Sequence, residues 1–429
     1  MLKLHFYYLR FSLVLLICSF SIKSHAQSEG LSLEFMISQA LRTYPSILSR
    51  EASKEAAESD VISAKLKFLP SPSISTQMNQ VTYTGTDPSN LPSKTITISQ
   101  PLFMGGALMA GYKKAGARLS AADYSILETR EDVAKRLVTY YVEWLKSWTK
   151  IQALEENVKL HDKFVGIINR RLQQGVAASA DADLALSRLE QAKSDLESQY
   201  SLEDNALNSI SELVGSPVTR AQLIPKVAAP VVVPKRKDGI EKAISSSVSI
   251  QRLKFEAESA QEEAKETKAL ALPQASFQVQ KQIGNPTIPG MKGYDLYGFV
   301  LSYAPGGGGL SALASANAAK ERARAALIQV DAAKRDLSER LNFEYNDFEF
   351  SKSKRDSLKR SSDLSAEISA SYDRQFLVGR KSWLELMNAV RENAQTRVAL
   401  ADAEGSVLGA SRRLKIYIDG SLQFDDSKP

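Results

Sequence analysis

The sequence predicts a mainly α-helical protein with a membrane β-barrel part, built from one unit that occurs twice in the chain. Two segments of nearly seventy residues lack proline and consist of helix-forming residues. Four segments of about ten residues contain apolar and polar side chains in alternation, as strands with two different faces do. Landmark residues recur after about 204 positions, which predicts a duplicated fold.

The first 26 residues have the pattern of a secretory signal peptide. Lys3 and Arg10 give a basic start, residues 11–20 are almost wholly apolar, and residues 24–26 offer a small-residue cleavage site. The apolar run is too short for a membrane-spanning helix. We therefore expect residues 1–26 to be removed during export.

Residue types that carry chemistry are scarce in the rest of the chain. Cys18, the only cysteine, and two of the three histidines lie within residues 1–26, so the exported chain keeps only His161. Disulfides and Cys- or His-based catalytic and metal sites are therefore not expected, and we predict neither an enzyme nor a cofactor. A lipid anchor at Cys18 is a minor alternative, because Ile17 precedes it where a small residue is wanted. Residues 1–26 carry three bases and no acids, so the net charge falls from +6 to +3, which is weak evidence for nucleic-acid binding.

Paired landmarks set the predicted organisation of the chain. Gly175 recurs as Gly379, and the dipeptide Leu69-Pro70 recurs as Leu272-Pro273, in the same order and at almost the same spacing. We expect both repeats to run helix, strand, strand, long helix, turn, helix. The predicted parts are a signal peptide at 1–26, a first repeat at 27–215, a linker at 216–237, a second repeat at 238–420 and a tail at 421–429.

The strands are predicted from the alternation. Phe277 and Val279, for example, alternate with Gln278 and Gln280. Each segment has the length that a tilted strand needs to cross a bilayer, and a face of Gln, Ser and Thr suits a water-filled lumen. Ordinary strands of a soluble sheet are the alternative. The predicted strands cover about 73–83, 94–103, 274–283 and 294–303.

Four strands are too few to close a barrel, since about eight are needed for the smallest one. Open sheet edges cannot face lipid, so spanning strands would require the protein to oligomerise.

The long helices are predicted at about 106–174 and 310–377, each followed past a tip by a shorter helix, at 181–214 and 382–418. A heptad pattern marks the first long helix as part of a coiled coil about 100 Å long. Its two apolar series are Leu137, Trp144, Ile151, Val158, Val165 and Leu172, and Tyr140, Leu154, His161 and Ile168. We expect His161 to be a packed residue of this seam.

The combination of these features resembles the TolC-type outer-membrane efflux and secretion channels. The resemblance covers nearly all of the exported chain and rests on the duplication, on the strand exit SQPLFMGG, and on the two tips QQGVAASADADLALSRLEQA and FLVGRKSWLELMNAVRENA. It implies a homotrimer in which each chain gives four strands to a twelve-stranded barrel and four helical rods to a periplasmic tunnel, a trimeric α/β barrel. It also implies that the tunnel is closed at its inner end until a pump and its adaptor engage it.

The resemblance also implies gating residues at the two tips. The family's acidic residue six positions after each tip glycine, Gly175 or Gly379, is present here as Asp181 and Glu385. A second acidic residue, nine positions after the second glycine, is replaced by Asn388. Three symmetry-related Glu385 carboxylates would favour cations at the tunnel end.

The family's basic latch residue at the second tip is present as Lys381, which we expect to bridge to Asp181 on a neighbouring coil. The family's aromatic hydroxyl three residues before Gly379 is replaced by Phe376, which puts one hydrogen bond of the closed gate in doubt. Ordinary capping and surface charge near a turn are the alternative explanation for these residues. The tip that contains Trp383 looks most like the branch that serves type I exporters of large adhesins and toxins.

We therefore predict a passive outer-membrane exit duct, with a tunnel that reaches into the periplasm. Its expected partners are a periplasmic membrane-fusion adaptor, an inner-membrane ABC or other pump, outer-membrane lipid and an exported protein or small-molecule cargo. Type I protein secretion is favoured, and service to a drug-efflux pump is the first alternative. A periplasmic coiled-coil adaptor or scaffold is the second.

Overall fold

The computed structural model describes residues 31–81, 89–223, 232–284, 292–303 and 310–420. The predicted signal peptide, the predicted tail and part of the predicted linker lie outside these residues. Within the described part, no helix is both long enough and apolar enough to cross a membrane.

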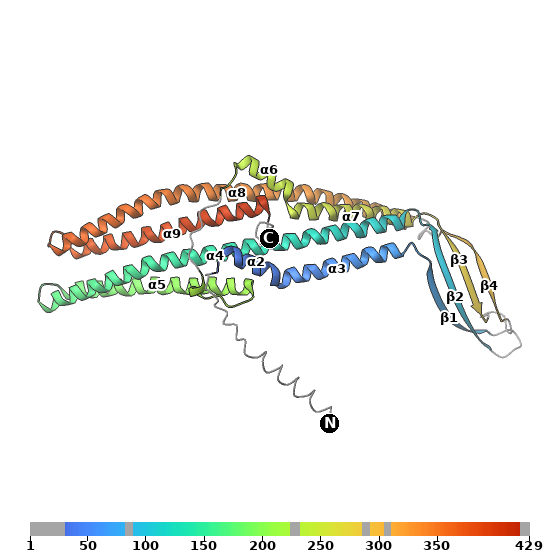
Figure 1. Ribbon diagram of the computed structural model, residues 1–429, viewed down its shortest axis with the longest axis horizontal. Helices are drawn as coiled ribbons and strands as arrows, with labels where there is room; N and C mark the ends of the chain where they lie inside the picture. The colour runs from blue at the N-terminus through green and yellow to red at the C-terminus, as the bar shows by residue number, and fades with distance from the viewer. Residues whose placement is uncertain (1–30, 82–88, 224–231, 285–291, 304–309, 421–429) are drawn as a thin grey trace, which may run out of the picture.

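The chain forms two halves with the same order of elements (Figure 1). The first half contains α2 (Leu33–Thr43), α3 (Pro45–Leu66), β1 (Ser71–Val81), β2 (Ser89–Phe103), α4 (Ala107–Gln173) and α5 (Ser179–Val214). A single 3-10 turn follows at Arg220–Gln222. The second half contains α6 (Arg236–Ser246), α7 (Val248–Leu270), β3 (Gln274–Ile283), β4 (Gly293–Ser302), α8 (Leu310–Leu377) and α9 (Trp383–Asp419). Mostly helical architecture with one small antiparallel sheet confirms the predicted fold class.

The four strands form one antiparallel sheet in the order β1-β2-β3-β4, at one end of the elongated molecule (Figure 1). The sheet therefore joins the two halves through the pairing of β2 with β3. Strands β1 and β4 are its open edges.

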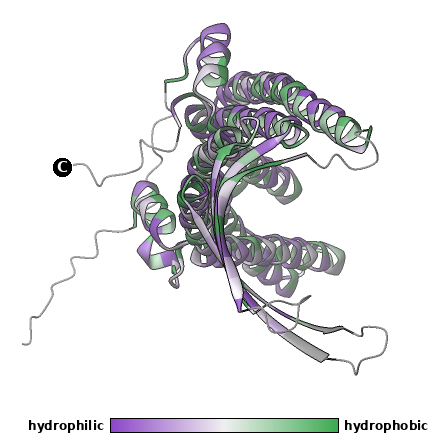
Figure 2. Cartoon of the chain, turned by 90° about the vertical axis from the view of Figure 1, so that its right-hand side faces the viewer, coloured by the Kyte–Doolittle hydropathy of each residue, from purple (hydrophilic) through white to green (hydrophobic). Residues whose placement is uncertain are grey.

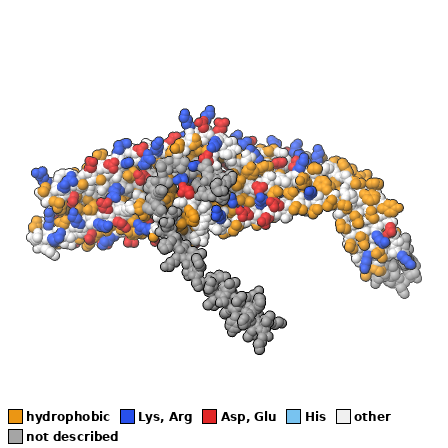
Figure 3. Space-filling view, viewed as in Figure 1, with side chains coloured by type: hydrophobic (Ala, Val, Ile, Leu, Met, Phe, Trp, Pro, Cys, Tyr) orange, Lys and Arg blue, Asp and Glu red, His pale blue; other side chains and the backbone are white. Residues whose placement is uncertain are grey.

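The sheet has two chemically different faces, because residues that pair directly across antiparallel strands point to the same side. Ile74 pairs with Ile96, and Phe277 pairs with Phe299 at a ring-centroid distance of 5.4 Å. This face is strongly exposed to solvent; Phe299, for example, is 81% exposed. On the opposite face, Thr97 pairs with Gln280, which is only half-exposed. Figure 2 views the molecule from this sheet end, and Figure 3 shows the same end in space-filling form.

The helices continue from the sheet as a long bundle. Helices α4 and α8 run its full length, which is about 100 Å for nearly seventy residues at 1.5 Å per residue. Near the sheet, α3 and α7 pack beside them, and beyond the middle α5 and α9 take over those places (Figure 1). Each half therefore ends in a helical hairpin, α4–α5 or α8–α9, whose tip lies farthest from the sheet.

Short helices close the junctions where one helix ends and the next begins. At the first junction, Gln39 of α2 donates a hydrogen bond to Ser216, just after α5 (3.3 Å). At the second, Lys242 of α6 binds Asp419 at the end of α9 (2.6 Å). The largest buried cluster lies next to the first junction and includes Trp144, which is wholly buried.

The seam of α4 differs from the predicted one in its outer part. The series that ends with Leu154, His161 and Ile168 is buried as predicted. Of the other series, Val158 and Val165 are only half-buried and Leu172 is exposed, while Asn157 and Phe164, one position earlier, are buried. In the middle of the molecule α4 is covered by several helices. Toward the tip it is covered by α5, α9 and the last turns of α8, so a smaller part of its surface is buried.

Candidate functional site

The two hairpin tips, which the sequence singles out as a gate, share one backbone turn. Gly175 and Gly379 both take left-handed conformations, with φ of +70° and +76°. At each tip the residue after the glycine donates a backbone hydrogen bond to a carbonyl five positions back: Val176 to Arg171 (2.9 Å) and Arg380 to Gln375 (2.9 Å). This is the glycine-based cap that ends many helices, and a side chain at either glycine would strain it.

The second tip is fastened by side chains. Ser382 and Glu385 form a capping box at the start of α9, where each side chain bonds the other residue's backbone N–H. Lys381 forms an ion pair with Glu385, at 2.6 Å between Nζ and Oε1. Hydrogen bonds from Lys381 and then from Ser382 lower the pKa of Glu385 to about 2. The Lys381 ammonium has a raised pKa, chiefly because of its bond to Glu385.

The partner of Lys381 is therefore on its own hairpin. Within one chain Lys381 binds Glu385, and a bridge to Asp181 on a neighbouring coil stays a prediction. Among the described residues, the Asp181 side chain has no hydrogen bond or ion pair. The four-residue spacing from Lys381 to Glu385, and the Ser-x-x-Glu pattern beside it, are the sequence signals for this fastening.

Tyr372 is a residue of the second tip that the sequence did not single out. Its ring lies 4.5 Å below the Lys381 ammonium, a cation–π contact. It stands one helical turn before Phe376, so an aromatic hydroxyl is present at this tip although position 376 lacks one. Comparing position 376 alone with the family pattern does not reveal Tyr372.

Phe376 itself belongs to a small apolar core behind the tips. It is buried and meets Phe164 of the other hairpin edge-on, with ring centroids 6.5 Å apart. The Arg171 guanidinium lies over its other side, 4.8 Å from the ring centre. Trp383, at the start of α9, packs partly buried against the same cluster, which also contains Leu386, Met387 and Val390. Apolar packing, one cation–π contact and an ion pair between Lys163 and Asp373 (3.7 Å) therefore join the two hairpins at this level.

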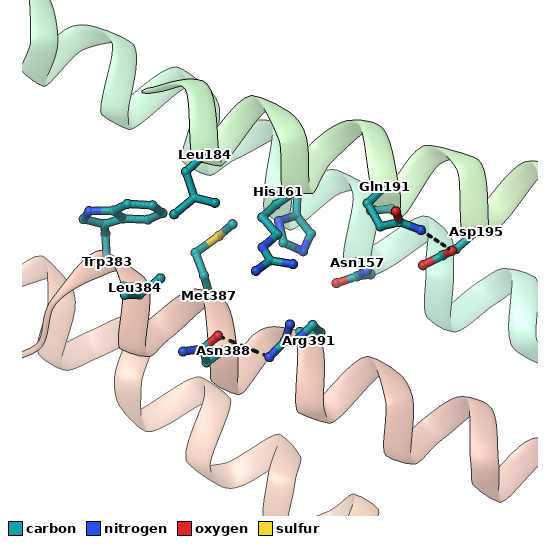
Figure 4. Close-up of a pocket in the computed structure, with 12 residues that line it drawn as sticks. Asn157, His161, Leu184, Gln191, Asp195, Trp383, Leu384, Met387, Asn388 and Arg391 are labelled. Atoms are coloured by element: carbon teal, nitrogen blue, oxygen red, sulfur yellow. Dashed lines mark hydrogen bonds between the residues drawn. The ribbon is translucent and has the colours of Figure 1, made fainter. Parts of the chain in front are cut away.

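An open pocket lies just behind this core, lined by residues of α4, α5 and α9 (Figure 4). His161 and Asn157 approach it from α4, Gln191 and Asp195 from α5, and Met387 from α9. Asn388, the residue that replaces the family's second acid, also lines it and accepts a hydrogen bond from Arg391 (3.4 Å). His161 is buried, as predicted for a seam residue. Burial lowers the pKa of its imidazole, and the charges of Arg188 and Arg391 lower it further.

The described contacts of this site can hold the two hairpins together. Its contacts are ion pairs, a capping box, cation–π pairs and apolar packing at the ends of the long helices. The hairpins are also joined higher up by Lys150 of α4, which binds Asp402 of α9 at 2.6 Å.

Comparison with known proteins agrees with this geometry. The sequence profile of the outer membrane efflux protein family matches residues 36–216. No curated protein sequence matches the chain.

Several solved structures share the fold over nearly their whole length. The outer membrane protein VceC of Vibrio cholerae has a TM-score of 0.77 at 13% identity, and the match covers 90% of this chain and 96% of that one. The CmeC outer membrane channel of Campylobacter jejuni has a TM-score of 0.75 at 14% identity, covering 92% and 86%. The open state of the MtrE outer membrane channel of Neisseria gonorrhoeae has a TM-score of 0.70 at 15% identity, covering 92% and 91%.

The family match over residues 36–216 and the shared fold agree with the predicted resemblance to TolC-type outer-membrane channels. Both findings support the outer-membrane location that the sequence predicted.

Proposed function

We propose that three copies of this chain close their sheets into one twelve-stranded barrel in the outer membrane. The observation that carries this proposal is the sheet itself. It has two open edges, β1 and β4, and one face of exposed apolar side chains. Four strands cannot close alone, and unpaired edges are not tolerated in lipid, so edge-to-edge pairing of copies satisfies both requirements.

The two faces of the sheet fit this arrangement. The face with Ile74, Tyr297 and Phe299 would contact lipid, and the face with Thr97 and Gln280 would line a water-filled lumen. The charged pair Lys281 and Asp295, 4.0 Å apart, lies on the lipid face only near its loop end. That is where headgroups and water would begin.

In this proposal the helices of three chains form a periplasmic tunnel that the tips close. The channel does no chemistry and draws its energy from an inner-membrane pump, reached through a periplasmic adaptor. The length of α4 and α8, about 100 Å, supports a reach across most of a periplasm.

The first experiment is mass determination and planar-bilayer conductance on the same detergent-extracted outer-membrane sample. A trimer that conducts in small, mostly closed steps is the expected result. A monomeric, non-conducting species would overturn the proposal and favour a periplasmic scaffold.

A matched pair of arginine substitutions tests the assignment of the two faces. Phe299→Arg puts a cation on the lipid face, at a cost of roughly 2–4 kcal/mol near the bilayer centre. We expect little assembled trimer in outer membranes, as measured by heat-resistant migration on gels. Gln278→Arg, on the other face, should assemble normally and change single-channel conductance. The reverse pattern would mean that the lumen face is the apolar one.

For the cargo, we propose type I secretion of a large protein. The tip sequence around Trp383 supports this choice, because this tip is the part that would meet the adaptor. Deleting the gene should remove one or a few large proteins from the culture medium and leave susceptibility to drugs unchanged. Increased drug susceptibility with an unchanged set of secreted proteins would instead support service to a small-molecule efflux pump.

A further inference from the structure

The pocket between α4, α5 and α9 contains buried polar atoms that lack partners. His161 is 3% exposed and Asn157 is 7% exposed, yet the Nδ1 atom of the first and the Oδ1 atom of the second form no hydrogen bond within the described chain. Buried polar atoms in folded proteins nearly always have partners. About 50 Å³ of the pocket is open to water, enough for a few water molecules or one small oxyanion. These atoms indicate a polar occupant: the Nδ1 atom of His161 can donate to an anion in one tautomer, whereas the Oδ1 atom of Asn157 only accepts and requires a water molecule.

The charges around the pocket indicate the sign of that occupant. Arg188 of α5 and Arg391 of α9 both line it, and neither forms an ion pair with a carboxylate of the described residues. Within the described part of the chain, Arg391 donates a hydrogen bond only to the amide oxygen of Asn388. The one acidic residue of the lining is Asp195, whose carboxylate accepts a hydrogen bond from Gln191 (2.9 Å). The balance is positive, with two guanidinium groups against one carboxylate.

The two arginines come from different hairpins. Both act on His161, since the charge of each disfavours protonation of its imidazole. Guanidinium groups bind carboxylate and phosphate oxygens in paired hydrogen bonds. An anion between them would remove their repulsion and join the first hairpin to the second.

We propose that this pocket binds a small oxyanion, of the phosphate or carboxylate type, which bridges Arg188 and Arg391 and ties the two hairpins together behind their tips. The site depends only on the geometry of one chain. The proposal is therefore independent of whether the channel exports proteins or small molecules.

His161 provides the test, because it is the only histidine outside residues 1–26. Processed protein with ¹³C-labelled histidine should give one imidazole NMR signal, which His161→Gln removes. Inorganic phosphate, added at constant ionic strength, should shift this signal saturably and raise the pKa of His161, because a nearby anion favours the imidazolium.

Substitutions decide whether the shift comes from the pocket. Arg188→Gln and Arg391→Gln should each weaken the apparent phosphate affinity by at least about tenfold, and Arg188→Lys should weaken it less. Arg170→Gln is the matched control, because Arg170 is an exposed arginine of the same tip region that does not line the pocket. It should leave the affinity unchanged.

Three results would overturn the proposal: no saturable shift with either phosphate or acetate, an equal shift in Arg188→Gln protein, or equal weakening by Arg170→Gln. The bridging role has its own test. Spin labels at Glu190 and Glu392, exposed residues of α5 and α9, should show a narrower distance distribution when phosphate is added. Binding without any change in this distribution would contradict the tie between hairpins.

Discussion

The two hairpin tips have the same backbone turn but are held by different forces. At the second tip, Ser382 and Glu385 cap α9, and Lys381 adds an ion pair. At the first, the residue in the capping position is Ala178, which offers no side-chain cap, and Asp181 has no side-chain partner among the described residues. A turn defined by glycine thus fixes the path of the chain, while its stability depends on the flanking side chains. The first tip should open locally more easily than the second.

The largest expected difference in stability concerns the residue three positions before each tip glycine, Gly379 or Gly175. Phe376 is 3% exposed in the apolar core, whereas Leu172, its counterpart, is 37% exposed. Phe376→Ala should destabilise the second tip by about 3–5 kcal/mol, because it removes a buried ring and leaves a cavity. Leu172→Ala should cost roughly 0.5 kcal/mol or less. Hydrogen exchange of the tip amides measures both, and equal effects would contradict the contrast between the tips.

The second difference concerns the caps, which can be exchanged. Ser382→Ala should destabilise the start of α9 by about 1 kcal/mol, because a helix N–H loses its acceptor. Ala178→Ser should stabilise the start of α5 by a similar or smaller amount. Amide exchange in the first turn of each helix is the measurement. If Ala178→Ser gave no added protection, the backbone of the first tip would not be suited to a cap.

The smallest effect is a dependence on pH at the second tip only. The pKa of Glu385 in the folded state, about 2, lies below its ordinary value of 4.5, so its contribution to stability is present above pH 4.5 and is lost as the pH falls toward 2. Amide protection at the second tip should therefore fall in this window, while the first tip stays unchanged.

Two variants control for general acid effects on this measurement. Glu385→Gln should abolish the dependence at the second tip, and Asp181→Asn should have no effect at the first. A parallel loss of protection at both tips in the unaltered protein would show that the acid effect is not due to Glu385.

Much of the fold was predictable because its signals are local. Alternation of side chains identified the strands, since adjacent residues of a strand point to opposite faces. The absence of proline, together with a recurring apolar pattern, predicted helices as long as α4 and α8. The glycines at 175 and 379 marked the tips, because only glycine adopts the left-handed turn without strain.

Other features were decided only by the tertiary structure. The heptad pattern of α4 could not show that less of its surface is buried toward the tip, because the extent of burial depends on which helices lie beside it. The apolar role of Phe376 and the contact between Tyr372 and Lys381 depend on how helices meet across a hairpin.

The sequence by itself therefore determined the repeat, the strands, the long helices and the turns, since each follows from residues close together in the chain. Tertiary structure decided which side chains face each other. His161 was predictable as a packed residue, but its position between Arg188 of one hairpin and Arg391 of the other was not. Residues 27 and 230 positions from His161 come together only when the two hairpins pack, and no local pattern encodes that contact.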